Sequence, residues 1–259
     1  MTRRYRMMLF LVSAGCLGVL MAMAFLAMPG FGQKSHFYRD HAVAASVKHV
    51  TANVVESVTF DQRGLDTLGE EVILLVSVVG AAALLRPSKE EDEKRKLQPG
   101  RVLEGTRLMG YLMLAVTMLI GMDVVIHGHL TPGGGFQGGV ILATGIHLVY
   151  LAGNYPALER LRPEHVFEVG EAVGAAAFAI LAMAGMIVAG AFLANVIPQG
   201  DSSAFGHLLS AGTVPLLNVL VGLEVASSFI VLLAAFFKQA LAIRGGASPQ
   251  GTVDRGGDR

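Results

Sequence analysis

Apolar residues in this sequence form long continuous runs that are separated by polar segments. Six runs are long enough to cross a hydrocarbon core of about 30 Å, which takes roughly 17–25 helical residues. They cover residues 7–28, 66–85, 107–127, 136–152, 170–194 and 215–237. None shows the strict alternation over about ten residues that a membrane β-strand requires. The pattern therefore predicts an all-α, polytopic membrane protein with about six transmembrane helices.

The composition agrees with a lipid environment. Of the 259 residues, 53% are hydrophobic and only 15% are charged, and the mean hydropathy is +0.56. A soluble domain has roughly a quarter of its residues charged. The formal net charge is zero, so no overall field favours a nucleic-acid partner. A single cysteine, Cys16, can form neither an internal disulfide nor a thiolate metal site, and no cofactor is expected.

The distribution of basic residues predicts the orientation. With both termini, the segment after the second run and the segment after the fourth run in the cytoplasm, 16 of the 20 Lys and Arg residues lie inside. This is the bias that the positive-inside rule describes. The first run has a basic start like that of a signal peptide. Its apolar core is longer than that of a typical signal, so an uncleaved helix is expected.

Charged residues divide the chain into regions. Residues 1–86 form a predicted two-helix region, and residues 87–100, with eight consecutive charged residues at their centre, form a predicted cytoplasmic linker. Residues 101–244 form a predicted four-helix membrane domain. The tail, residues 245–259, is rich in Gly, Asp, Ser and Arg and is expected to be disordered.

A glycine-rich motif lies between the third and fourth runs. It consists of Thr131, Pro132, Gly133, Gly134, Gly135 and Phe136. One interpretation is a tight hairpin whose glycines let two helices touch closely. The other is glycine backbone at membrane depth, whose free carbonyls line a small wet cavity. The motif also matches the spelling of a dinucleotide loop, but it follows an apolar helix rather than a strand, so that function is excluded.

Ionisable residues inside apolar runs are costly and are therefore candidates for an ion route. The candidates are Asp66, Glu70, Glu71, Asp123, His147 and Glu224. The helical rise of about 1.5 Å per residue places Glu224 and His147 near mid-bilayer. Glu224 shares a helix face with two serines that could solvate a proton or a cation. The structural alternative for Glu224 is a hydrogen bond that holds helices together.

The acids at the start of the second run also have two interpretations. Asp66 and Glu70 are four residues apart and so share a helix face. Acids at a helix N-terminus suit capping and the helix dipole. Yet three acids in six residues exceed what a cap needs, and close carboxylates suit exchange of a proton for a cation. Asp123 lies near the same outer side, while a dipole role is favoured for Glu168 and Glu171.

Two stretches resemble a known family. Residues 128–139, Gly-His-Leu-Thr-Pro-Gly-Gly-Gly-Phe-Gln-Gly-Gly, resemble the signature of the B-type component (MnhB/MrpB) of multisubunit Mrp-type sodium–proton antiporters. This likeness covers roughly residues 100–244. Residues 60–70, Phe-Asp-Gln-Arg-Gly-Leu-Asp-Thr-Leu-Gly-Glu, are similar to the C-terminal segment of the large A-type antiporter component, which is a separate, MbhE-like protein in membrane-bound hydrogenases. The chain resembles a fusion of the two.

The resemblance implies a non-catalytic membrane subunit of a Na+/proton antiporter in a bacterial or archaeal cell membrane. Its implied partners are antiporter components of the A, C, D, E, F and G types, and its implied ions are Na+ and H+. The family's Asp-x-x-Gly-Glu acids, here Asp66 and Glu70, are implied to line a cation or proton route. Two alternatives stay open: a subunit of a hydrogenase or other redox-driven ion pump, and a purely structural scaffold. Nothing indicates a soluble enzyme.

The orientation can be tested with tags at both ends of the chain. We expect both tags to stay unlabelled when a membrane-impermeant reagent is added outside intact cells, and to react after permeabilisation, because both termini are predicted to be cytoplasmic. Labelling of both tags from outside would overturn the predicted orientation.

Overall fold

The computed structural model describes residues 3–28, 36–86, 103–152 and 163–246. Within these ranges all regular secondary structure is helical, which confirms the predicted all-α class. The predicted linker at residues 87–100 and most of the predicted disordered tail lie outside the described residues. The basic residues Arg160 and Arg162, on which the orientation partly rests, also lie outside them.

The described helices follow the predicted runs closely. In chain order they are α1 (Arg3–Leu26), α2 (Phe37–Lys48), α3 (Val54–Ser57), the π-helix η1 (Val58–Gln62), α4 (Gly64–Leu84), α6 (Glu104–Ile126), α7 (Gly135–Leu151), α9 (Glu164–Ala189), the 3-10 turn η2 (Ser202–Ala204) and α10 (Val214–Gly246). Among the described residues, five helices are long and apolar enough to span a membrane: α1, α4, α6, α9 and α10. Helix α7, which corresponds to the fourth predicted run, is apolar but has 17 residues and is not among these five.

The chain forms two separate units, residues 1–41 and residues 42–259. In the first unit α1 is apolar on all sides and has no buried residue. A helix that is hydrophobic all round needs lipid or other helices around it. Helix α1 by itself therefore has the character of a membrane span.

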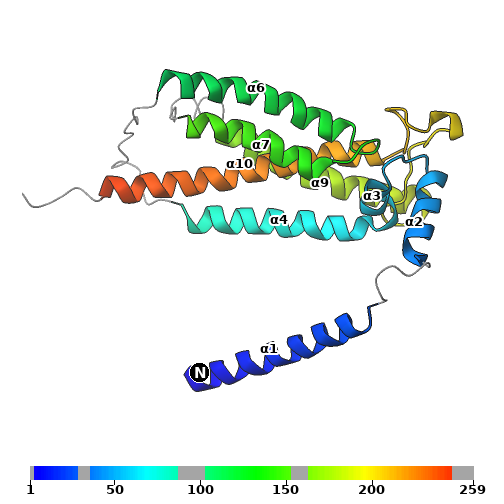
Figure 1. Ribbon diagram of the computed structural model, residues 1–259, viewed down its shortest axis with the longest axis horizontal. Helices are drawn as coiled ribbons and strands as arrows, with labels where there is room; N and C mark the ends of the chain where they lie inside the picture. Colours follow the sequence, from blue (N-terminus) through cyan, green and yellow to red (C-terminus); the bar gives the residue numbers. More distant parts are fainter. Residues whose placement is uncertain (1–2, 29–35, 87–102, 153–162, 247–259) are drawn as a thin grey trace, which may run out of the picture. The chain divides into compact units, whose positions relative to one another are not determined.

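Helix α10 is the central helix of the second unit (Figure 1). It packs against α4, α7 and α9 and touches α6, which in turn packs against α7. Half of its apolar window is buried, against 17–22% for α4, α6 and α9. Polar side chains on α10 are therefore shielded from lipid by neighbouring helices.

The apolar core lies around the first half of α10. Leu217 and Val221 of α10 belong to it together with Phe60 of η1 and Phe178 of α9. The rings of Phe60 and Phe178 have their centroids 6.4 Å apart. This core fixes η1 and α9 against the same stretch of α10.

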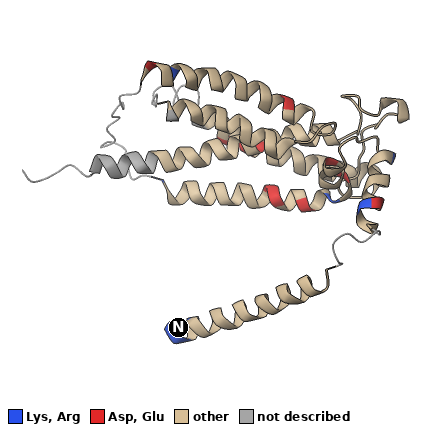
Figure 2. Ribbon diagram, viewed as in Figure 1, with Lys and Arg blue, Asp and Glu red and all other residues tan. Residues whose placement is uncertain are grey.

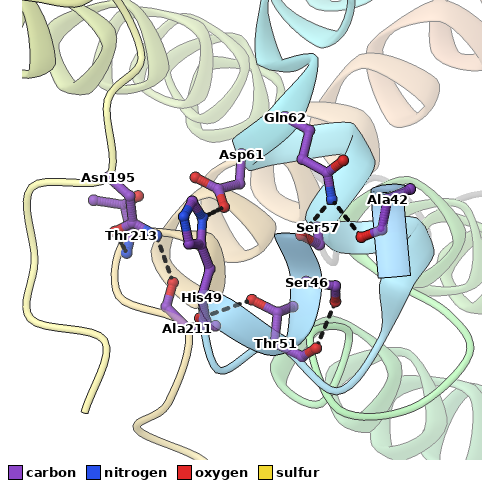
Figure 3. Close-up of polar contacts among 10 residues, drawn as sticks. All are labelled: Ala42, Ser46, His49, Thr51, Ser57, Asp61, Gln62, Asn195, Ala211 and Thr213. Carbon is purple, nitrogen blue, oxygen red and sulfur yellow. Dashed lines mark hydrogen bonds and ion pairs between the residues drawn. The ribbon is translucent and has the colours of Figure 1, made fainter. Parts of the chain in front are cut away.

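Residues 37–62, which lie between the first two predicted runs, fold into α2, α3 and η1. Figure 3 shows the polar contacts that hold this segment together. The Gln62 amide donates to the Ala42 carbonyl and to the Ser57 hydroxyl, both at 3.0 Å. The imidazole of His49 pairs with the carboxylate of Asp61. These contacts give the segment a defined structure. Helix α3 lies at the end of the bundle where α6 turns into α7, and this end is called the α3 end below (Figure 1).

Glycines let α7 and α9 approach α10 closely. A Cβ atom built on Gly139 of α7 would lie 2.8 Å from the Cβ of Val225 and 3.0 Å from the carbonyl oxygen of Gly222. On α9, a Cβ at Gly174 would lie 2.7 Å from the Cβ of Glu224. Small residues of this kind are the usual means of close packing between membrane helices.

The close approach at Gly139 predicts a clear effect of substitution. Gly139→Ala should lower the free energy of unfolding by about 1–3 kcal/mol, because the added methyl group meets atoms that can move only with the α10 backbone. Thermal unfolding of the purified protein in one detergent measures this.

Gly80→Ala on α4 is the matched control, since no atom lies within 4 Å of its Cβ position. It should leave stability unchanged or raise it by up to about 1 kcal/mol, because alanine is the better helix former. Equal melting temperatures for the two variants would contradict the packing described here.

Candidate functional site

Three buried glutamates from three helices lie close together inside the bundle. Glu71 of α4, Glu171 of α9 and Glu224 of α10 have exposed fractions of 1%, 4% and 0%. The carboxyl groups of Glu71 and Glu224 are neighbours that interact with each other, and among the described residues none of their four oxygen atoms has a hydrogen-bond partner. Two such groups repel each other when both are charged. A proton or a cation between them removes that repulsion.

Glu171 forms the next part of this cluster. The Ser228 hydroxyl donates a 2.9 Å hydrogen bond to its Oε1 atom, and the Glu171 carboxylate also interacts electrostatically with that of Glu224. Ser228 follows Glu224 by four residues, about one helical turn along α10. The cluster therefore has two levels: the Glu71–Glu224 pair and the Glu171–Ser228 pair.

The local sequence explains why these side chains meet. Glu224 and Ser228 share a face of α10 because they are four residues apart. Gly170 and Gly174 flank Glu171 on α9, and a Cβ at Gly170 would lie 2.6 Å from the hydroxyl oxygen of Ser227. The two glycines bring the α9 backbone close to α10, and Glu171 between them reaches Ser228.

The six candidates from the sequence do not all join this cluster. Glu71 and Glu224 are brought together, whereas Asp66 and Glu70 lie on the exposed side of α4. Asp66 forms an ion pair with Arg63, and 55% of its side chain is exposed. An exposed carboxylate on a membrane-spanning helix needs water, lipid headgroups or a partner chain beside it.

The other two candidates lie elsewhere in the bundle. Asp123, near the end of α6, pairs with His127 at 2.9 Å, and 71% of its side chain is exposed. His147 of α7 is buried and makes an edge contact with the ring of Phe237, the centroids being 6.0 Å apart. Phe237 lies about 20 Å beyond Glu224 along α10 at the helical rise of 1.5 Å per residue. His147 and Glu224 therefore lie at different depths, and the prediction that both lie near mid-bilayer is wrong for one of them. The helices of the bundle carry few acidic residues (Figure 2).

Sequence reasoning missed two buried acids. Glu171 was assigned to the helix dipole, although its place between Gly170 and Gly174 is a signal of close helix packing that could have identified it. Glu56 of α3 lies outside the apolar runs and received no role, yet it is only 4% exposed. Burial raises the pKa of Glu56 to about 7, and the polar Asn218 side chain nearby opposes this rise. Its neutral form is therefore favoured below that pH.

The glycine-rich motif forms a tight hairpin between α6 and α7, in agreement with the first of the two interpretations. Gly133 and Gly134 have φ angles of 145° and 135°, which residues with a Cβ rarely adopt. The Gly135 amide then donates a 2.7 Å hydrogen bond to the Asn218 side chain of α10. The motif thus joins the start of α7 to α10.

His127 and His129, the two histidines beside the motif, have different neighbours. His129 is fully buried, and burial lowers its pKa, while contacts of its ring with the backbone of His207 and Leu208 act the other way. His127 instead pairs with Asp123. Among the described residues no group of three or more His, Cys, Asp or Glu side chains could hold a metal ion.

Two family models match the chain. A domain related to the MnhB component of Na+/H+ antiporters matches residues 106–231, and the family of MbhE, a component of the MBH complex, matches residues 2–98. These matches confirm the resemblance drawn from the two sequence stretches.

Two relatives among known proteins are similar in sequence. An uncharacterised protein of Methanocaldococcus jannaschii is 32% identical over 195 residues, which cover 68% of this chain and 74% of that protein. A probable K+/H+ antiporter protein of the combined A/B type, from Rhizobium meliloti, is 29% identical over 199 residues, or 67% of this chain. The chain spans only 20% of the length of that antiporter protein.

Two solved structures share the fold. A chain of the membrane-bound sulfane sulfur reductase, an archaeal respiratory membrane complex, matches with a TM-score of 0.68 and 30% identity, over 90% of this chain and 98% of that one. A chain of the Mrp complex from Dietzia sp. DQ12-45-1b matches with a TM-score of 0.63 and 23% identity, over 92% of this chain and 26% of that one.

The apolar helices and these likenesses together identify a multi-pass membrane protein of a prokaryotic cell membrane. The chain belongs to the family of membrane subunits in which an MbhE-like region is joined to a domain related to the MnhB component of Na+/H+ antiporters.

Proposed function

We propose that this protein is a membrane subunit of a multisubunit monovalent cation/proton antiporter, and that its buried carboxyl groups form part of the ion route. The observation that carries the proposal is the facing pair Glu71–Glu224 inside a membrane domain of the MnhB-related family. The relative described as a probable K+/H+ antiporter component supports it. The partners would be other antiporter subunits, and the protein itself would be no enzyme.

Stability alone does not account for the carboxyl cluster. Replacing a buried ionic group by apolar residues of similar volume is often neutral or stabilising, so a bundle gains little by keeping three acids in its interior. Ionisable groups inside membrane domains are instead typical of ion and proton pathways. The burial of Glu71, Glu171 and Glu224 therefore favours ion transfer over a purely structural scaffold.

The geometry of the pair suggests how exchange would be coupled. One positive charge, either a proton or a monovalent cation, neutralises half of the Glu71–Glu224 pair and removes the repulsion. A second positive charge would be bound less favourably, because the repulsion is already removed, so a proton and a cation would compete for the same place. Such competition is the basis of exchange. Glu171, which Ser228 orients one turn away, would pass the ion to or from the inner side.

The predicted orientation would place the α3 end of the bundle outside. Asp66 and Glu70 lie on α4 between that end and Glu71, on its exposed face. Their carboxylates would then face a neighbouring subunit or an aqueous entrance. The centre of the proposed route is nevertheless the buried pair, where lipid and bulk water are both excluded.

Removing either carboxyl group of the pair should greatly lower exchange. We expect Glu71→Gln and Glu224→Gln each to lower cation/proton exchange in everted vesicles at least about tenfold, which corresponds to about 1.4 kcal/mol in the barrier. The double variant should be no worse than the stronger single variant, because both carboxyl groups serve one site. The complex should assemble normally.

Glu70→Gln is the matched control, since it makes the same change at the neighbouring residue on the exposed face of α4. It should lower exchange less than Glu71→Gln does, because its carboxylate lies on the exposed face of α4 and not in the buried pair. Wild-type exchange in both pair variants would favour the scaffold hypothesis, and a larger loss at Glu70 than at Glu71 would move the route to the exposed face.

A second candidate function is a membrane subunit of a redox-driven ion pump. The observation that favours it is the match to a chain of the membrane-bound sulfane sulfur reductase, which covers 98% of that chain at 30% identity. The carboxyl cluster would then transfer ions in response to electron transfer in partner subunits.

Purification of the tagged full chain from its native membrane distinguishes the two functions. The antiporter proposal predicts that the other membrane subunits copurify without iron–sulfur absorbance, and that exchange proceeds on an imposed ion gradient with no electron donor. Copurified iron–sulfur subunits, together with ion transfer that requires a reductant, would support the redox-driven pump instead.

A further inference from the structure

The glycine-rich motif contacts a residue from the other half of the chain. Asn53, at the start of α3, donates from its side-chain amide to the carbonyl oxygens of Gly128 at 2.7 Å and Thr131 at 2.8 Å. Its backbone amide donates to the carbonyl oxygen of His129 at 2.9 Å. One residue thus binds three carbonyl groups of a single turn.

These carbonyls need such a donor. They lie in the turn that follows α6. Carbonyl groups at this end of a helix have no partner within the helix, so their donors come from elsewhere. The Asn53 side chain supplies two donors to them, while its Oδ1 atom accepts a 3.1 Å hydrogen bond from the Val55 amide and so caps α3. Asn53 therefore fixes the start of α3 and the turn after α6 at the same time.

Glu56 completes the contact one turn later on α3. Its carboxyl group lies directly against Gly134, where a Cβ atom would collide with it. Asn218 of α10 meets the same place, because its Oδ1 atom would lie 3.1 Å from a Cβ at Gly134 and accepts a hydrogen bond from the Gly135 amide. The space left by a glycine at residue 134 is therefore filled by a side chain from α3.

The contacts that Asn53 and Glu56 make with the turn cross from one family region to the other. Asn53 and Glu56 lie in the MbhE-like region, residues 2–98, whereas the turn and Asn218 lie in the MnhB-related domain, residues 106–231. We propose that Asn53, Glu56, Gly134 and Asn218 form a clasp that docks the MbhE-like region onto the MnhB-related domain. The glycine-rich motif is then the receptor for this clasp, and its function is assembly.

The clasp can be tested in the full chain by cutting it after folding. A protease site is inserted between Glu90 and Glu91, the protein is folded and purified in detergent, and the chain is then cut. A tag on the C-terminal fragment retains the complex while loss of the N-terminal fragment is followed over time. We expect the wild-type fragments to stay together.

Asn53→Asp tests the clasp with the smallest change. The new carboxylate keeps the acceptor that caps α3 but turns the two donors into an acceptor facing carbonyl oxygens. The N-terminal fragment should then be lost at least about tenfold faster, the effect of losing two hydrogen bonds and leaving their carbonyls without donors.

Asn195→Asp is the matched control. Asn195 donates to the Ala211 carbonyl at 2.9 Å and accepts from the Thr213 amide at 2.8 Å, so it binds a turn in the same way, but entirely within the MnhB-related domain (Figure 3). This variant should retain the N-terminal fragment like wild type. Separation of the wild-type fragments, or equal retention in the Asn53 and Asn195 variants, would overturn the proposal.

A second pair of variants tests the clasp if Asn53→Asp does not fold. Gly134→Ala should speed loss of the N-terminal fragment, and Glu56→Ala in the same chain should restore part of the retention, because it removes the carboxyl group that collides with the new methyl group. A double variant that is no better than Gly134→Ala alone would show that the two residues do not meet in the docked protein.

Discussion

Lipid cannot solvate the polar groups of α10, and this constraint shapes the rest of the bundle. An unsatisfied polar group in the hydrocarbon region costs several kcal/mol. Helices α4, α7 and α9 surround α10 and supply both cover and polar partners. They can do so because glycines at residues 139, 170 and 174 remove the side chains that would hold the backbones apart.

Polar contacts occur at successive depths along this one helix. Asn218 meets Glu56 at the α3 end, Glu224 meets Glu71 further in, and Ser228 meets Glu171 one turn beyond. Glu56 and Glu71 come from the MbhE-like region, whereas the others come from the MnhB-related domain. The carboxyl pair is therefore complete only when the two regions are docked, so the proposed clasp and the proposed ion route depend on the same assembly.

The candidate site was only partly predictable. Glu224 stood out in the sequence because a charge inside an apolar run is costly. Among the acids of the second run the sequence and the family resemblance favoured Asp66 and Glu70, and Glu71 was only a further candidate. The pattern also placed Glu70 beside Glu71, but adjacent residues on a helix point about 100° apart, and only packing decided which of them is buried. Glu171 and Glu56 were not selected, because their neighbours Ser228 and Gly134 are distant in the sequence.

The sequence alone determined the long apolar runs, and hence the membrane helices and their order, because the need to cover about 30 Å of hydrocarbon acts on each segment separately. The glycine-rich motif in the sequence was also enough to identify the family. The tertiary structure decided how each helix is rotated and which faces meet, because those choices depend on contacts between residues many turns apart. This packing places Glu71 next to Glu224. It also places α3, which precedes α4, against the glycine-rich turn.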